Sequence, residues 1–431
     1  MLKDCCETVL SEERNYPHPR CIVSHPGMHH SYQIAFSLQE AGLLEKFITR
    51  FYYKDQGFFD KILRFFPRKY SKLLQYEFKR RKLEGLNENL ICSYPCDDLF
   101  FKVLRSVGPI NRVLPDTTLL TNSWHDTRTA KIVRSLCPNA VFCFDGSALY
   151  TFNVAREVGA VCILSQMIGY IKAGLRIMNE EAWLHPDFAD TMSLNNVREV
   201  MIERCTEEIL TADFVLAGSD YVKESLYETG VSASRIVVLP YGADIDRFRP
   251  RPKHGNHIFR ILFVGSITQR KGIKYLLEAF KRLALPRAEL VLVGGIIGSG
   301  EGLKPYRNIF RHIPHVPHFE VHKVFQNSDI FVYPSLHEGS AIAVYEALAS
   351  GLPVITTPNS GSVVCDRKEG YIVPIRDVEA LMEKILLLYE DQYLRDSMSR
   401  NARELAKSFT WEKYHQSLSG IVRGFIREKK V

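Results

Sequence analysis

Short continuous apolar runs alternate with longer runs of helical spacing in the first half of the chain. The short runs predict strands. Helical stretches separate them, and alternating strands and helices are typical of a parallel sheet with helices on both faces. The predicted strands are Cys21–Ser24, Thr118–Asn122, Val141–Phe144, Val161–Leu164 and Phe214–Ala217.

The second half repeats this pattern after a break. Residues 240–257 are rich in Pro, Gly, His and Arg and have little apolar periodicity, which indicates a domain boundary. We therefore predict an α/β protein with two Rossmann-like doubly wound domains that face each other across a cleft. The predicted bounds are 1–240 for the N-terminal domain, 241–410 for the C-terminal domain, and 411–431 for a final helix that packs back on the N-terminal domain.

Composition narrows the class of protein. The 431 residues are 46% hydrophobic and 24% charged, which suits a large buried core and excludes general disorder. No window approaches the roughly 18 consecutive apolar residues of a membrane span, and the first residues lack the apolar core of a signal peptide. Ten cysteines without a CxxC pair suit reduced thiols, so we expect a cytoplasmic protein.

The charge is concentrated in one segment. Residues 61–82 hold nine Lys or Arg and one Glu, a net charge of +8, whereas the whole chain carries +7. Phe, Leu and Tyr are interleaved with these charges, as in amphipathic segments that bind anionic lipid. A peripheral position on the inner membrane face is the favoured interpretation, and a solvated helix face is the alternative. We expect no nucleic-acid partner, because no other motif points to one.

The most informative motif lies in residues 333–355. A strand is followed by a loop with Glu338 and Gly339, and then by a helix predicted from about Ser340 to Ser350. The free N–H groups at the start of that helix attract an anion such as a diphosphate, and Gly339 lets it approach. Glu338 and Glu346 stand eight residues apart, so one carboxylate can hold a sugar and the other a ribose. The predicted anion-binding N–H groups are those of Ser340, Ala341 and Ile342.

These residues resemble a known family. Glu338 and Glu346, within PSLHEGSAIAVYEALASGLPVI, resemble the E-x7-E motif of the retaining GT-B glycosyltransferases of family four. FVGSITQRKGIKYLLEAF is similar to the diphosphate-binding turn of that family, and SDIFVYPS to the strand before its glutamates. The resemblance covers residues 205–411. It implies sugar transfer from a nucleotide sugar with retention and without a metal or another cofactor.

The turn after the strand RILFVG supplies cations. Arg270 and Lys271 open a helix there, where they can neutralise the charge that grows on a departing diphosphate. We predict Glu338, Lys271 and Arg270 as catalytic residues, with Gly265 and Ser266 among the donor-binding ones. Members of the family commonly have Arg directly after the strand glycine, where this chain has Ser266, and Arg270 is the candidate to compensate.

Three residues are candidates for the acceptor side of the cleft. Gly27 lies in the first glycine-bearing loop, and His125 and Asp145 follow predicted strands, where ligands of α/β sheets bind. The resemblance implies a glycan acceptor in polysaccharide or glycoconjugate biosynthesis, and a lipid-linked glycan is one form that such an acceptor takes. Loop side chains without a role in binding are an equal alternative for each of the three.

Other motifs carry less weight. Asp244 and Asp246 have the DxD form of metal-binding glycosyltransferases but lie in the segment between the domains. His312, His315, His318 and His322 are separated by prolines that prevent a common helical face. Two alternative functions stay open at this point: a nucleotide-sugar 2-epimerase of the same fold, and a non-catalytic adaptor that binds glycans or membranes.

Overall fold

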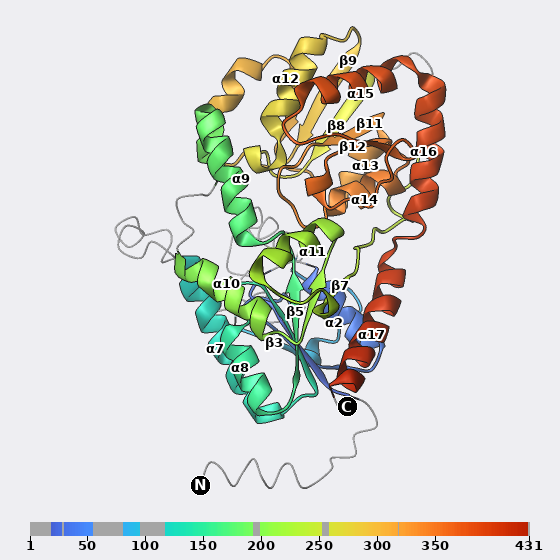
Figure 1. The fold of residues 1–431 in the computed structure, drawn as a ribbon. Coiled ribbons are helices and arrows are strands. Elements are labelled where there is room, and N and C mark those ends of the chain that lie inside the picture. The colour runs from blue at the N-terminus through green and yellow to red at the C-terminus, as the bar shows by residue number, and fades with distance from the viewer. Residues whose placement is uncertain are drawn as a thin grey trace, which may run out of the picture.

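The computed structural model describes residues 19–27, 30–54, 81–94, 117–192, 199–251, 258–317 and 319–429. The described chain forms two parallel sheets, each covered by helices, and the domains are stacked one above the other (Figure 1). The predicted fold class is therefore confirmed. Most of the basic segment 61–82 lies outside the described residues, so its membrane-binding role stays a prediction.

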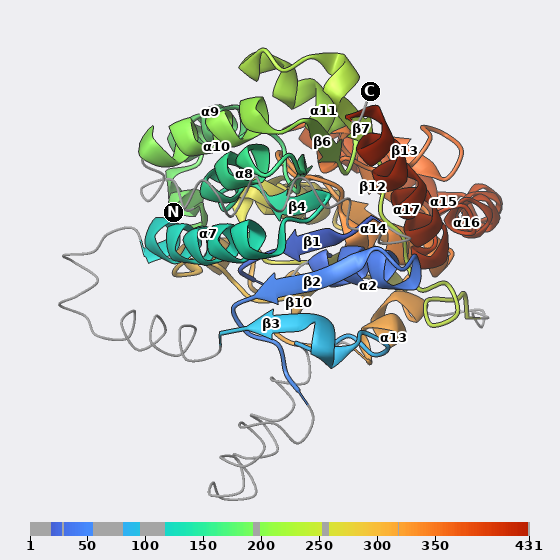
Figure 2. The same cartoon turned by 90° about the horizontal axis from the view of Figure 1, so that it is seen from below.

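The N-terminal sheet has seven parallel strands in the order β3-β2-β1-β4-β5-β6-β7. Figure 2 shows β3, β2 and β1 side by side at one edge. The strands β2 and β3 were not predicted, because β2 contains Glu and Lys and β3 is only three residues long. The seven strands are β1 (Cys21–Ser24), β2 (Leu44–Thr49), β3 (Ile91–Ser93), β4 (Ala140–Phe144), β5 (Val161–Gln166), β6 (Phe214–Ala217) and β7 (Ile236–Val238).

Helices and short 3-10 turns connect these strands. The α-helices are α2 (Ser31–Glu40), α7 (Thr117–Leu136), α8 (Leu149–Glu157), α9 (Ile171–Leu184), α10 (Glu199–Thr211) and α11 (Asp220–Leu226). The 3-10 turns are η1 (Glu88–Leu90), η2 (Pro186–Thr191), η4 (Tyr227–Thr229) and η5 (Ala233–Arg235).

The predicted strand Thr118–Asn122 is wrong, because these residues belong to α7. The buried side of α7 includes the polar residues Thr121, His125 and Thr129, spaced four apart. A helix whose buried stripe is polar leaves no apolar period in the sequence. The β-branched residues Thr118 and Thr121 instead favoured the prediction of a strand.

The C-terminal sheet has six parallel strands in the order β10-β9-β8-β11-β12-β13. The strands are β8 (Phe259–Val264), β9 (Ala288–Val293), β10 (Phe310–Ile313), β11 (Ile330–Tyr333), β12 (Val354–Thr356) and β13 (Gly370–Ile372). The helices are α12 (Ile273–Leu283), α13 (Val321–Gln326), α14 (Ile342–Ala349), α15 (Val378–Glu390), α16 (Gln392–Ala406) and α17 (Trp411–Glu428). The 3-10 turns are η6 (Gln269–Lys271), η7 (Glu301–Tyr306) and η8 (Pro358–Ser360).

The two segments that join the domains lie against each other. Ala243 N donates to Phe409 O at 3.0 Å, and a Cβ on Gly242 would lie only 2.4 Å from the carbonyl carbon of Thr410. Only glycine therefore fits at this crossing. Beyond it, α17 returns to the N-terminal domain and packs beside α2, with Phe425 stacked on Phe214 at a centroid distance of 3.8 Å.

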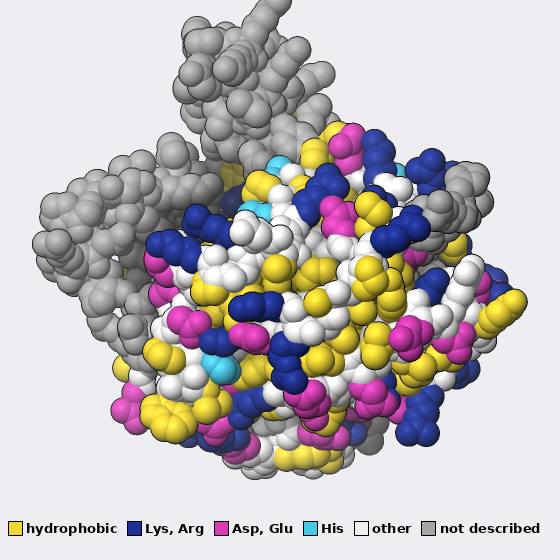
Figure 3. Space-filling view, turned by 90° about the horizontal axis from the view of Figure 1, so that it is seen from above, with side chains coloured by type: hydrophobic (Ala, Val, Ile, Leu, Met, Phe, Trp, Pro, Cys, Tyr) yellow, Lys and Arg dark blue, Asp and Glu magenta, His cyan; other side chains and the backbone are white. Residues whose placement is uncertain are grey.

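The outer face of the C-terminal domain carries basic and acidic side chains interspersed among apolar ones (Figure 3). Such a surface produces no large field of one sign. Within the described residues, none of the helices combines the length and apolar character needed to cross a membrane. The seven cysteines in this part of the chain are free thiols.

Candidate active site

The turn after β8 and the loop after β11 meet at the carboxyl edge of the C-terminal sheet, because β8 and β11 are adjacent strands. Leu336 N donates to Arg270 O at 2.9 Å, which ties the loop to the turn. Gly272 has a φ of +67°, and a Cβ there would lie 2.1 Å from Pro334 O. The close contact between turn and loop therefore depends on this glycine.

This contact brings three predicted site residues together. Lys271 Nζ lies 2.5 Å from Glu338 Oε2, and Arg270 Nη1 lies 3.3 Å from the same oxygen. Burial alone would raise the pKa of Glu338, but the two cations hold it at about 2. Burial lowers the pKa of Lys271, although Glu338 opposes this effect. The site thus holds two cations around one carboxylate.

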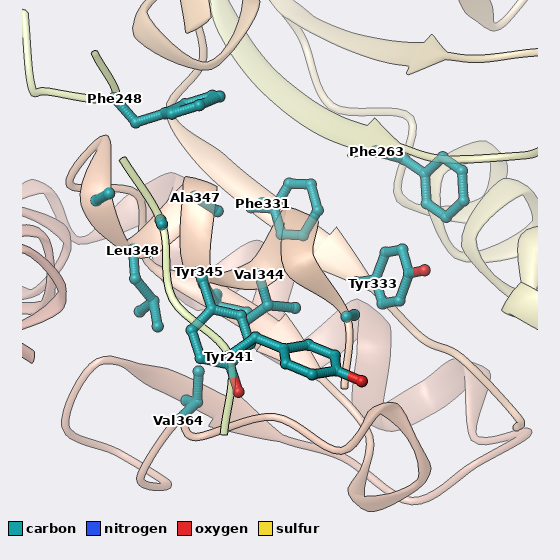
Figure 4. Packing of buried hydrophobic residues seen from close by; sticks show 14 of the residues in the cluster. Tyr241, Phe248, Phe263, Phe331, Tyr333, Val344, Tyr345, Ala347, Leu348 and Val364 are labelled. Carbon is teal, nitrogen blue, oxygen red and sulfur yellow. The ribbon is translucent and has the colours of Figure 1, made fainter. Parts of the chain in front are cut away.

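Tyr333 anchors this cluster from the core. Its ring lies between those of Phe263 and Phe331, at centroid distances of 5.5 and 5.8 Å, and its hydroxyl points away from the Phe331 ring (Figure 4). The hydroxyl donates to Glu338 Oε2 at 3.1 Å and also contacts Lys271 Nζ. All the described bonds of the Glu338 carboxylate fall on Oε2.

The helix that carries Glu346 begins later than predicted. It is α14, which begins at Ile342, so Ser340 and Ala341 precede it as buried residues. Ser340 Oγ lies 2.7 Å from Tyr345 Oη and donates to Gly361 O at 3.2 Å. The predicted helix start at about Ser340 is therefore two residues too early, and within the stretch from Glu338 to Glu346 only Ile342–Glu346 is helical. Burial raises the pKa of Glu346 to about 8, against the attraction of Arg247.

Gly339 lies at a close contact between the two domains. A Cβ at this position would lie 1.7 Å from Met167 O of the N-terminal domain, and Ser219 Oγ donates to Gly339 O at 2.5 Å. The space left by the missing side chain is thus filled by backbone from the other domain. In the structure Gly339 brings the two domains together.

A cavity of about 390 Å³ lies between the domains next to this cluster. Arg270 and Ser266 line it from the C-terminal domain, and Asp145 and Gln166 line it from the N-terminal domain. Burial raises the pKa of Asp145 to about 6. Of the three acceptor-side candidates, Asp145 is the one that lines the cavity.

The other two candidates lie elsewhere. His125 does not follow a strand, as noted above; it is buried inside the N-terminal domain, where Nε2 lies 2.9 Å from Ser24 Oγ. Burial lowers the pKa of His125 to about 3, so the ring is neutral. Gly27 N lies 3.0 Å from His25 Nδ1, in the turn after β1.

Residues 244–405 match the family model described as glycosyl transferases group 1. A D-inositol 3-phosphate glycosyltransferase of Paenarthrobacter aurescens is 28% identical over 222 residues, which are 45% of this chain and 54% of that protein. The putative colanic acid biosynthesis glycosyltransferase WcaL of Escherichia coli is 29% identical over 40% of this chain and 47% of its own length. These matches span about half the length of the curated relatives.

Residues 244–405 are a glycosyl transferases group 1 domain. Solved structures show that the fold around it is GT-B. The sucrose-phosphate synthase of Thermosynechococcus elongatus superposes with a TM-score of 0.63 at 15% identity over 95% of this chain and all of that one. Anabaena HepE, in complex with UDP and glucose, gives a TM-score of 0.60 at 12% identity over 94% of this chain and all of HepE.

An arm of the N-terminal domain, α9 with η2 (residues 171–191), reaches the group 1 domain and was not predicted as part of the site. Its Glu181 is fully buried and accepts from Gln269 Nε2 at 2.7 Å and from Arg376 Nε at 2.5 Å. Thr191 Oγ1 accepts from Gln269 N at 2.9 Å. The arm therefore holds the residue next to Arg270 and Lys271. The sequence of the arm shows no signal for this role.

His337 was also missed, although it directly precedes Glu338. Its side chain leaves the group 1 domain and enters a socket in the N-terminal domain, where Tyr221 Oη lies 2.7 Å from its Nδ1. A Cβ on Gly169 or Gly174 would lie 2.7 and 2.6 Å from the ring, so both glycines make room for it. Burial lowers the pKa of His337 to about 4, which leaves the ring neutral.

Asp244 and His312, from the two remaining motifs, have ordinary structural partners. Asp244 Oδ1 accepts from the backbone N of Asp246 and Arg247, at 3.2 and 3.0 Å, and so forms a local turn. His312 Nε2 lies 2.8 Å from Gly294 O. His318 lies outside the described residues. Within the part of the chain that is described, no group of three or more His, Cys, Asp or Glu is placed to hold a metal ion.

Proposed function

We propose that the protein is a retaining glycosyltransferase that moves a sugar from a nucleotide-sugar donor to a glycan acceptor. The observation that supports this most strongly is the pair of cations, Arg270 and Lys271, around Glu338 in a group 1 domain. HepE, which shares the fold, is solved with UDP and glucose. A nucleotide diphosphate is the class of ligand that two adjacent cations at a sheet edge suit.

We assign a separate role in the reaction to each residue of the cluster around Glu338. Lys271 and Arg270 neutralise the diphosphate as it departs, so the reaction needs no metal for this purpose. Tyr333 and the two cations hold Glu338 by Oε2, which leaves Oε1 to accept from a sugar hydroxyl. The first free N–H groups of α14 and the carboxyl group of Glu346 complete the donor side.

We propose a transfer step that retains the anomeric configuration. The bond from the anomeric carbon to the diphosphate oxygen breaks, and a new bond to the acceptor oxygen forms on the same face. The acceptor proton moves to the departing phosphate oxygen. No protein side chain is required as a general base.

A nucleotide-sugar panel tests this proposal. We expect one nucleotide sugar to raise the unfolding temperature of the full chain and to be consumed in the presence of EDTA, with an anomeric configuration in the product that NMR shows to be unchanged. Inverted product would contradict retention, and loss of turnover with EDTA would contradict metal independence. Free epimerised donor in the absence of an acceptor would favour the epimerase alternative, and failure of every donor to bind would favour the adaptor.

The acceptor and the location are part of the same proposal. We propose a lipid-linked acceptor reached at the inner membrane face, with residues 61–82 as the docking segment. Vesicles with and without anionic lipid test this directly. Binding that persists after the nine basic residues are replaced by Gln would contradict the proposed docking segment.

A further inference from the structure

Two polar side chains of the N-terminal sheet, Asp145 and Gln166, line the cavity between the domains. Asp145 follows β4 and Gln166 ends β5, and the two strands are adjacent. Asp145 Oδ1 and Gln166 Oε1 are both buried, and neither has a hydrogen-bond partner among the described residues. A buried acceptor without a partner is destabilising. A ligand that donates hydrogen bonds would remove that cost.

The amide of Gln166 has only one orientation that satisfies its surroundings. Its Nε2 donates to Ile168 O at 2.9 Å and lies 3.5 Å from Asp145 Oδ2. A flipped amide would place an oxygen against these two oxygens. The free atom is therefore Oε1, and the open positions on Asp145 and Gln166 are both acceptors.

Hydrogen bonds to Glu208 fix the loop that carries Asp145. Glu208, fully buried, accepts from Gly146 N at 2.6 Å and from Ala148 N at 2.8 Å. Arg204 Nε donates to the same carboxylate at 3.0 Å. The loop that presents Asp145 is thus fixed before any ligand enters, which lowers the entropy cost of binding.

The rest of the lining is largely apolar. Its apolar side chains include Leu175, Met178, Met192 and Ile297. From the C-terminal domain, Arg270 lines the cavity; it donates to His337 O at 2.6 Å and pairs with Glu338. Apolar walls with these two acceptors suit a pyranose ring, whose faces are C–H groups and whose edges are hydroxyls.

We propose that this cavity binds a neutral pyranose of the acceptor, whose hydroxyls donate to Asp145 Oδ1 and Gln166 Oε1. The charge of Asp145 then excludes sugars that bring a carboxylate or a phosphate to these two residues. The inference rests on the proposed function and specifies its acceptor class. A like charge placed beside Asp145 at a desolvated site is strongly unfavourable, which makes the exclusion effective.

Saturation-transfer NMR on the full chain with UDP tests the cavity without requiring turnover. The probes are methyl α-D-glucopyranoside, which is neutral, and methyl α-D-glucopyranosiduronate, which carries a carboxylate. We expect signals from the neutral glycoside alone, and a loss of at least fivefold in Asp145→Ala and Gln166→Leu. Asp145→Asn, which keeps the volume, should admit the uronate. Glu157→Gln, an exposed carboxylate on α8, is the control with unchanged signals.

Equal signals from both glycosides on the unaltered chain, no signal from the neutral one, or variants that bind as well as the unaltered chain would each overturn the inference. Weaker binding of the donor relative to UDP in Asp145→Ala, with the glycoside signal intact, would also overturn it, because the pocket would then belong to the donor sugar. The proposed function fails separately, when no nucleotide sugar in the panel binds.

Discussion

On the C-terminal side of the cleft, the residues that follow β8 and β11 are charged, and two cations surround the carboxylate of Glu338. On the N-terminal side, the residues at the ends of β4 and β5 present only hydrogen-bond acceptors, Asp145 and Gln166. The two sheet edges have similar topology, but one presents cations and the other presents hydrogen-bond acceptors. The first suits an anionic leaving group, and the second suits hydroxyl groups.

The arm of residues 171–191 complicates this division, because it belongs to the N-terminal domain and holds the turn of the C-terminal one. Glu181 accepts from three side chains of the group 1 domain: Gln269, Tyr275 and Arg376. The cationic edge is therefore completed by residues from the opposite domain. Separation of the domains would break these bonds and release the turn.

The largest effect is expected at Glu181. Its replacement by Ala leaves Arg376 without its buried partner and should lower the free energy of unfolding by about 3–5 kcal/mol. Denaturant unfolding measures this. Glu180 is the matched control, since it pairs with the same Arg376 at 2.9 Å but its side chain is 60% exposed. Glu180→Ala should cost less than about 1 kcal/mol. Equal costs for the two variants would refute the arm as a clamp.

The second largest effect is expected at Lys271, in the cluster that Arg270 and Lys271 form around Glu338. Lys271→Ala should reduce turnover about a hundredfold, or on the order of 3 kcal/mol of transition-state stabilisation, because a charge on the leaving group is left unneutralised. Steady-state kinetics with the nucleotide sugar identified in the panel measure this reduction in turnover. Lys281→Ala, which changes an exposed lysine on α12, the helix after this turn, should retain full turnover. Unaltered transfer in Lys271→Ala would sink the assignment of the cluster.

A smaller effect tests whether Arg270 replaces a cation at position 266. Both residues line the cavity, and Ser266 is exposed, so an arginine fits there. Arg270→Ala should lower turnover about tenfold, and the double variant Ser266→Arg with Arg270→Ala should recover most of it. A double variant no better than the single one would show that the cation must come from position 270.

The smallest effect concerns Glu346. Its pKa rises from the ordinary 4.5 to about 8 in the folded state, so the unfolded chain loses this proton first as the pH rises. Stability should therefore fall between these two pH values, by about 1 kcal/mol after allowance for partial exposure. Glu346→Gln should flatten this dependence in denaturant unfolding, whereas Glu390→Gln, an exposed control on α15, should not.

Donor affinity is the second measurement on Glu346. If its carboxyl group holds the ribose, Glu346→Ala should weaken nucleotide-sugar binding in calorimetry about tenfold. An unchanged affinity would leave Glu346 as a buried helix residue with no part in the donor site.

The C-terminal domain was easier to predict than the N-terminal one. Arg270, Lys271 and Glu338 stand within a few residues of strands that are almost wholly apolar, so strand, turn and motif could be located together. In α7 the buried stripe is polar, and the same reasoning produced a strand and placed His125 beside the cleft. Helical periodicity in the sequence is a signal only when the buried face is apolar.

Local patterns in the chain were thus sufficient for the two-domain α/β fold and for the cations and carboxylates at the C-terminal edge, because turns and strand ends are encoded by neighbouring residues. The tertiary structure alone decided which partners these groups have. Glu181 lies 88 residues from Gln269, and His337 is buried by glycines of the other domain. Such contacts depend on how the two domains pack against each other. No local pattern in the sequence contains that information. The same closure places Asp145 and Gln166 opposite Arg270 and thereby forms the cavity.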